Sequence, residues 1–363
     1  MTTNASYLYG VIPAQQARTF GPIGLDGGEV RTVCEAGLGV VTSPSPRVAF
    51  AEVPPERTLQ CLAQHQRVLE QVMRDSPVLP LKFGTFADDD RQVREILQGG
   101  RKDFAATLDQ YADVVEVDIA AVWADLQTVL TEIASDETII AMKARIAGQG
   151  APGLEQKIQL GQAVRMLLDR RREQLAGELE GLLKVGWPRM IVNTVQDDSV
   201  ILNAAVLVRR EDQSRFDRAL ENLNRRYGDR INFRCVGPLP PYSFATAEVR
   251  TLATDALDAA RRSLGLGESA SFAEIKVAYR RILQESHPDK DPSGQAAERL
   301  QQATAAYELL EEYALNVRHT FAAGERCPVL VRVRSLEDLR GGPRPTRRLD
   351  RTRPGNRLGT EAA

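Results

Sequence analysis

Residue types that perform acid–base, nucleophilic or metal chemistry are few and scattered in this sequence of 363 residues. It contains no C-x-x-C pair, no H-E-x-x-H, no G-x-S-x-G and no glycine-rich phosphate loop. The acidic run Asp88–Asp90 lacks the glycine and distal glutamate of a calcium loop and fits a solvated helix start. The isolated histidines and cysteines are His65, His287, His319, Cys34, Cys61, Cys235 and Cys327. The sequence therefore predicts no catalytic residue, no metal site and no cofactor, and its unpaired cysteines indicate a reducing compartment.

One short motif points to recognition instead of catalysis. The triplet His287-Pro288-Asp289 follows the helical pattern E-I-K-V-A-Y-R-R-I-L, in which Lys276, Arg280 and Arg281 share one face. A second helical pattern with an Ala-Tyr pair follows the triplet. This combination resembles a J-domain, which implies contact with a chaperone ATPase of the Hsp70 class through those six residues.

The J-like segment departs from the J-domain pattern at two positions. Arg262-Ser263 precedes Leu264-Gly265 where an aromatic residue is usual, and Leu300 stands where phenylalanine is common. The sequence leaves open whether the contact with Hsp70 is retained.

A second block is Gly237-Pro-Leu-Pro-Pro-Tyr-Ser-Phe244, in which three prolines fix φ and remove three backbone donors. It resembles the C-terminal signature of the GvpF/GvpL family of gas-vesicle proteins. Two more blocks, Y-L-Y-G-V-I from Tyr7 and L-P-L-K-F-G-T from Leu79, match this family in the same order. The signature positions are Tyr7, Tyr9, Gly10, Pro80, Phe83, Gly84, Pro238, Pro240, Pro241, Tyr242 and Phe244.

The resemblance to the GvpF/GvpL family implies a non-enzymatic accessory protein of gas-vesicle formation. Its expected partners are the small hydrophobic shell protein and other accessory proteins, and its expected location is the cytoplasm and the gas vesicle. The family usually has a Glu-Trp pair before a strand near residue 116, where this chain has Glu116-Val117. An alternative is a general J-domain co-chaperone whose α+β part binds unrelated clients.

The first hundred residues predict an α+β domain that positions the first two signature blocks. Strands are expected at 7–12, 29–34, 38–42 and 47–53, with a hairpin turn at 35–37. Apolar residues at helical spacing predict a helix through Leu59, Leu62, Leu69 and Val72. A second helix is expected to begin at Asp88 and to end at Gly99-Gly100.

The middle of the chain predicts the order β-α-β-β-α-β with an enlarged first crossover. Strands are expected at 114–119, 189–195, 200–209 and 231–236, and helices between about 121 and 184 and from Phe216 to Tyr227. This order is typical of ferredoxin-like domains.

After Phe244 the patterns are helical only, with three helices expected over residues 252–264, 272–282 and 300–310. The tail holds seven arginines against one acid between Arg340 and Arg357 and has too few apolar residues to fold. The predicted fold class is therefore α+β, with two small α+β domains followed by a helical module. The expected boundaries are 1–112, 113–248 (ferredoxin-like), 249–322 (J-like) and 323–363 (a basic, largely disordered tail).

Composition agrees with a globular protein that does not wrap nucleic acid. Hydrophobic residues make up 43% of the chain, and 47 basic against 49 acidic residues give a net charge of −2. No apolar run approaches the roughly 18 residues of a membrane span, and no signal peptide is indicated. We therefore expect neither a membrane nor a nucleic acid as partner.

Overall fold

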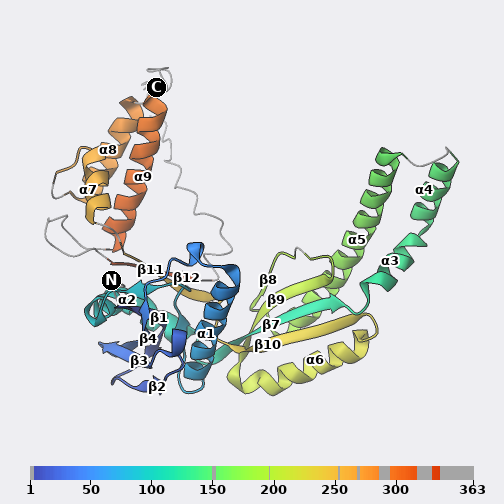
Figure 1. The fold of residues 1–363 in the computed structure, drawn as a ribbon, viewed down its shortest axis with the longest axis horizontal. Helices are drawn as coiled ribbons and strands as arrows, with labels where there is room; N and C mark the ends of the chain where they lie inside the picture. Colours follow the sequence, from blue (N-terminus) through green and yellow to red (C-terminus); the bar gives the residue numbers. More distant parts are fainter. Residues whose placement is uncertain are drawn as a thin grey trace, which may run out of the picture.

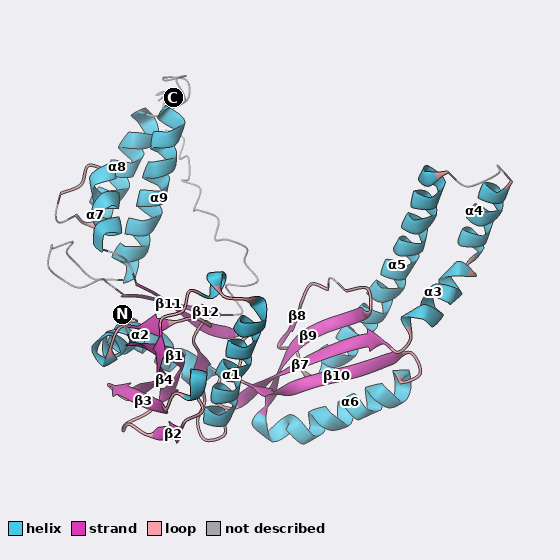
Figure 2. Cartoon of the chain, in the orientation of Figure 1, coloured by secondary structure: helices cyan, strands magenta, loops and turns pink. Residues whose placement is uncertain are grey.

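The structure is a computed structural model that describes residues 4–148, 153–195, 197–251, 254–267, 270–285, 295–316 and 329–335. Two antiparallel sheets with helices packed on them are followed by a helical module (Figures 1 and 2). The predicted α+β class is confirmed. No helix in these described stretches is long and apolar enough to cross a membrane.

The N-terminal sheet is built around its first strand. Its order is β2-β3-β4-β1-β5, and β6 also pairs with β1. The strands are β1 Asn4–Pro13, β2 Thr19–Gly21, β3 Val30–Glu35, β4 Leu38–Pro46, β5 Leu79–Pro80 and β6 Phe86–Ala87. The predicted hairpin at 35–37 is confirmed, with positive φ at Ala36 (50°) and Gly37 (86°), as a tight hairpin turn requires.

Several details of this region differ from the sequence prediction. The expected strand at 47–53 is wrong, because Phe50–Glu52 form a 3-10 turn in which the Phe50 ring packs on Phe83 at 4.4 Å. Helix α1, Pro55–Met73, is present, but Leu59 and Leu62 are 65% and 42% exposed. The predicted Leu69 and Val72 are buried, and the rest of the buried face of α1 is formed by Cys61, His65, Val68 and Met73.

Helix α2, Asp90–Gln110, does not stop at Gly99-Gly100 as predicted. Its N-cap is Asp89 and not Asp88, since the Asp89 carboxylate accepts a hydrogen bond from the Gln92 N–H. A Cβ on Gly100 would lie 2.5 Å from the Phe104 ring and 2.8 Å from Val331 Cγ1. Glycine is therefore needed here for close packing inside the helix, not for ending it.

The second sheet has the order β10-β7-β9-β8 with all neighbours antiparallel, which confirms the ferredoxin-like prediction. Its elements are β7 Val114–Trp123, β8 Met190–Val192, β9 Val200–Arg209, the 3-10 turn Arg210–Asp212, α6 Gln213–Tyr227 and β10 Ile231–Leu239. The enlarged crossover consists of α3 Leu126–Ala134, α4 Glu137–Ala147 and α5 Leu154–Gly186. These three helices project from the sheet as a long arm (Figure 1).

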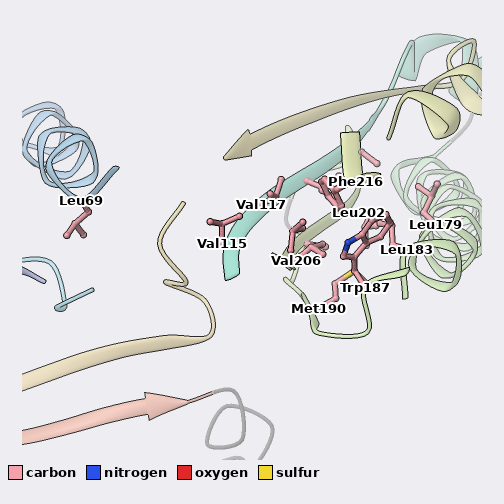
Figure 3. Packing of buried hydrophobic residues seen from close by; sticks show 14 of the residues in the cluster. Leu69, Val115, Val117, Leu179, Leu183, Trp187, Met190, Leu202, Val206 and Phe216 are labelled. Atoms are coloured by element: carbon pink, nitrogen blue, oxygen red, sulfur yellow. The ribbon is translucent and has the colours of Figure 1, made fainter. Parts of the chain in front are cut away.

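The core of this part lies between the sheet and its helices. Trp187 meets Phe216 edge-on at 4.8 Å, and both lie against Leu179, Leu183 and Val206 (Figure 3). The two α+β parts do not have separate hydrophobic cores, because each of the two largest buried clusters contains residues from both parts.

The prediction that only helices follow Phe244 is wrong. The helices α7 Thr254–Ser263, α8 Phe272–Glu285 and α9 Gln295–Asn316 lie between two strands, β11 Ala245–Thr251 and β12 Val329–Ser335. These strands pair antiparallel with each other. Residues 329–335, assigned to the tail from sequence, form a strand in which Val331 and Val333 pack into the buried cluster that includes residues of α2. The arginine-rich segment 340–357 lies outside the described residues.

Neighbouring glycines of α2 give a matched test of this packing. Gly99→Ala meets open space and should stabilise the protein by about 1 kcal/mol through helix propensity. Gly100→Ala should destabilise it by about 1–3 kcal/mol, because the new methyl overlaps Phe104 and Val331. Thermal or urea unfolding of both variants measures this, and equal effects of the two substitutions would contradict the packing described here.

Candidate functional site: the signature cluster and the J-like module

The signature residues of the first two blocks meet around a buried histidine that the sequence analysis did not single out. Tyr7, Tyr9 and Phe83 lie within 5.7 Å of the His65 ring, measured between ring centroids. His65 is fully buried on α1, and burial lowers its pKa to about 3, which keeps the ring neutral. A lone histidine on an amphipathic helix gave no signal in the sequence, because its two tyrosine partners lie more than 50 residues away.

Hydrogen bonds fix the two tyrosines of this cluster. The Gly84 N–H donates to the Tyr7 hydroxyl at 3.2 Å, so this hydroxyl can donate its own proton to His65 Nδ1 at 2.8 Å. The Leu25 N–H donates to the Tyr9 hydroxyl at 2.8 Å, and Ser43 Oγ lies 2.8 Å from the same oxygen. Burial is the largest cause of the raised pKa of both phenols. They are therefore structural hydrogen-bonding groups.

Gly10 and Pro80 are direct partners in the ladder between β1 and β5. A Cβ on Gly10 would lie 2.9 Å from side-chain atoms of Leu69 and Val78, so the strand and α1 approach each other too closely for any other residue. This pair explains two signature positions by packing alone.

The block at 237–244 forms a turn that brings the chain back to the N-terminal sheet. The Pro241 carbonyl accepts hydrogen bonds from Phe244 N–H at 3.0 Å and Ala245 N–H at 2.7 Å. Phe244 is fully buried, and its carbonyl accepts a bond from the Tyr111 hydroxyl at 3.3 Å. Tyr242 is half-buried and packs beside His65, with 6.2 Å between their ring centroids. Pro238 is exposed and follows a cis peptide bond.

Glu116 is the second residue whose role was not predicted. It is only 1% exposed, and its two carboxylate oxygens accept hydrogen bonds from Ser243 N–H at 2.8 Å and Ser243 Oγ at 2.7 Å. Burial raises the pKa of Glu116 to about 8, against the opposing effect of the two bonds from Ser243. Asp118, on the same face of β7, also has a raised pKa because of burial. Glu116 thus joins the central strand of the second sheet to the returning block.

The three helices of the J-like module pack around one apolar core. The fully buried side chains Leu264, Ile275 and Leu310 lie at its centre. Tyr279 stacks on Tyr307 with 4.4 Å between ring centroids. Helix α8 begins at a capping box in which Ser271 N–H donates to the Glu274 carboxylate at 2.6 Å and the Glu274 N–H to Ser271 Oγ at 3.3 Å.

The predicted chaperone-contact residues divide into two groups. Arg280 and Arg281 are exposed on α8, and the Lys276 ammonium lies 4.0 Å from the centroid of the Phe272 ring. His287, Pro288 and Asp289 lie outside the described residues. The role of all six stays a prediction. Among the described residues, no three His, Cys, Asp or Glu side chains are placed to hold a metal ion.

Removing the aromatic side chains of the returning block should destabilise the fold. We expect about 3 kcal/mol for Phe244→Ala, and a similar loss for Tyr242→Ala, from lost burial and the cavity left behind. Tyr242→Phe is the control: the buried Tyr242 hydroxyl has no hydrogen-bond partner, so its removal should cost little. Thermal melts of purified variants measure this. Unchanged melting with lost partner binding would instead make the block a contact surface.

The buried Glu116 predicts a pH dependence with a defined sign. Because its pKa is near 8 in the folded protein and near 4.5 when unfolded, the folded state binds more protons between these values. The stability it contributes is complete below pH 4.5 and is lost as the pH rises toward 8 and beyond. Melting temperature should therefore fall from pH 5 to pH 8 more steeply in the wild type than in Glu116→Gln. Parallel curves for the two proteins would contradict this.

Comparison with known proteins assigns both parts of the chain. Residues 5–246 match the family of gas vesicle synthesis proteins GvpL/GvpF, and residues 262–315 match the DnaJ domain. Gas vesicle protein F of Dolichospermum flosaquae is 27% identical over 248 residues, which cover 66% of this chain and 96% of that protein. Gas vesicle protein L2 of Halobacterium salinarum is 27% identical over 237 residues, covering 61% of this chain and 83% of that protein.

Two solved structures share the fold. The crystal structures of GvpF from Anabaena sp. PCC7120 and from Microcystis aeruginosa each superpose with a TM-score of 0.53 at 23% identity. Each comparison covers 66% of this chain and at least 95% of the other chain. Since the family match spans two-thirds of the sequence, this chain belongs to the GvpL/GvpF family of gas vesicle synthesis proteins and carries a C-terminal DnaJ domain.

Proposed function

We propose that this chain is an accessory protein of gas-vesicle assembly. Its family body, residues 5–246, binds the small hydrophobic shell protein, and its J-like module recruits a chaperone ATPase of the Hsp70 class. The observation that carries the proposal is the presence of a GvpL/GvpF body and a DnaJ domain in one chain. Neither family is a family of enzymes, so the proposed activity is binding and delivery.

The physical need for such a protein follows from the shell subunit. A polypeptide whose apolar face will line a gas space aggregates in water unless another surface covers that face. The ferredoxin-like sheet offers one means of covering it. Strand β10 lies at the edge of this sheet and carries Val236, which is 54% exposed. Within the described residues no strand pairs with the outer side of β10, and such an edge accepts an added strand.

The module supports chaperone recruitment through its charge. Arg280 and Arg281 are exposed on α8, where an acidic surface can meet them. Contacts between exposed charges are screened over about 8–10 Å near physiological ionic strength. The proposed contact is therefore transient and sensitive to salt.

Co-expression with the shell protein tests the first half of the proposal. The full-length chain should raise the soluble fraction of the shell protein, and Val236→Asp should reduce this effect by blocking the apolar edge of β10. Arg234→Gln lowers the net charge by the same one unit at a neighbouring exposed residue of the same strand and face, and is the matched control for the loss of apolar surface. A shell protein that stays insoluble with the full-length chain contradicts the assignment. Equal protection of unrelated apolar clients would support a general co-chaperone instead.

ATP hydrolysis by the host's Hsp70 tests the second half. The full-length chain should stimulate it, His287→Gln should abolish the stimulation without unfolding the module, and Arg280→Glu should weaken it, most strongly at low salt. Arg262→Glu reverses an exposed charge on α7, outside the basic face, and should leave the stimulation unchanged. If the wild-type chain gives no stimulation across a salt series, the module does not recruit Hsp70.

A further inference from the structure

The J-like module is inserted between two paired strands of one small sheet. β11 and β12 pair from Ala245 opposite Ser335 to Thr251 opposite Val329. The chain leaves for the module after Thr251 and returns from it at Val329, so the entry and exit residues are direct ladder partners. Only two residues separate β11 from α7. The return path from α9, which ends at Asn316, to β12 runs through residues 317–328, which lie outside the described residues. The short connection of the module is therefore the one that follows β11.

This small sheet is joined to the N-terminal sheet of the family body. Leu81, directly after β5, forms a parallel bridge with Ala247, and the Lys82 N–H donates to the Ala247 carbonyl at 2.9 Å. Glu248 has a side chain only 12% exposed and forms ion pairs with Lys82 and Arg334, each at 3.0 Å. The body, β11 and β12 are thus linked by main-chain bonds and by one shared carboxylate.

β12 also packs on the body through its apolar side. Val331 is 7% exposed and belongs to the same buried cluster as Phe104 and Ala247. Its Cγ1 takes the space that a Cβ on Gly100 would need. The opposite side of β12 carries the exposed arginines Arg332 and Arg334. One face of a seven-residue strand therefore fits the surface of α2, and the other faces solvent.

β12 belongs to the part of the chain outside the family body. The GvpL/GvpF match ends at residue 246, and the match to the Dolichospermum protein already covers 96% of that relative. The extension thus supplies both the module and the strand that fastens it. On the entry side, the two-residue connection between β11 and α7 reaches only about 7 Å, far less than a flexible linker would allow, so fixing β11 by pairing with β12 also restricts the start of the module.

We propose that β12 holds the J-like module in a set direction on the family body, so that a chaperone recruited by the module acts on a polypeptide bound to the same molecule. The inference rests on the proposed function. Its physical basis is effective concentration: two partners held on one rigid scaffold meet far more often than two that diffuse separately. Releasing β12 from the body should lower the effective concentration of the chaperone near the bound polypeptide, while the exposed surface of α8 stays unchanged.

The test compares Val331→Asn with Arg332→Asn in the full-length chain. Both place the same polar side chain in β12, on its buried and its exposed side respectively. Hydrogen exchange at β11 amides should rise at least about tenfold in Val331→Asn, with little change in Arg332→Asn or within α8 and α9. A second variant carries six Gly/Ser residues inserted between Thr251 and Thr254, which lengthens the connection without changing either strand. It keeps the test valid if Val331→Asn fails to fold.

The functional measurement is the soluble fraction of the shell protein in the presence of Hsp70 and ATP. Both Val331→Asn and the insertion variant should stimulate Hsp70 alone as the wild type does, but should lose about fivefold or more of the chaperone-dependent gain in soluble shell protein. Arg332→Asn should keep that gain. If the wild type is active, and the insertion variant and Val331→Asn both keep its full chaperone-dependent gain in soluble shell protein, the positioning role of β12 is wrong while the proposed function stands. A wild type with neither stimulation nor gain overturns the proposed function as well.

Discussion

Residues 240–247 return the chain from the second α+β part to the first, and most of the remaining architecture depends on this return. Pro240 and Pro241 limit the conformations of this segment, and the turn at Pro241 directs Phe244 into a fully buried position. Ser243 bonds to the buried Glu116 of the second sheet, while Ala247 joins the first sheet beside Leu81. Apolar burial thus holds the two parts together, and the hydrogen bonds between Ser243 and Glu116 link the returning segment to the second sheet.

The same return creates the attachment point of the J-like module. Because β11 directly follows the buried Phe244, its position is set by the core of the body, and β12 pairs with a strand that is already fixed. The arm formed by α3, α4 and α5 projects from the other end of the molecule (Figure 1). The family body therefore places the β10 edge, which we propose as the client surface, and the attachment point of the J-like module on one scaffold.

Local patterns in the sequence predicted much of this fold. The hairpin at 35–37, the β-α-β-β-α-β order and the three module helices follow from turn residues and from periods of 2 and 3.6, which depend on neighbours in the chain. The pairing of β11 with β12 could not be predicted, because nearly 80 residues lie between the strands. Gly99-Gly100 suggested a helix end, since the contacts that explain Gly100 come from the position of the Phe104 ring and from the distant Val331, and neither is visible in the local pattern.

The candidate site, like the fold, was predictable from the sequence only in part. The signature tyrosines and glycines were identified from their blocks, but the residues they surround were not. His65 and Glu116 show their importance only through burial and through partners far along the chain. Buried polar residues of this kind look like ordinary surface residues in a single sequence.

The central claim is that one molecule holds the shell protein and the chaperone at the same time. Native mass spectrometry of the full-length chain mixed with shell protein and ATP-bound Hsp70 tests it most directly. The account predicts a ternary complex containing all three proteins, which dissociates to the complex with shell protein alone when salt is raised. Only binary complexes, with Hsp70 and the shell protein excluding each other from this chain, would contradict it.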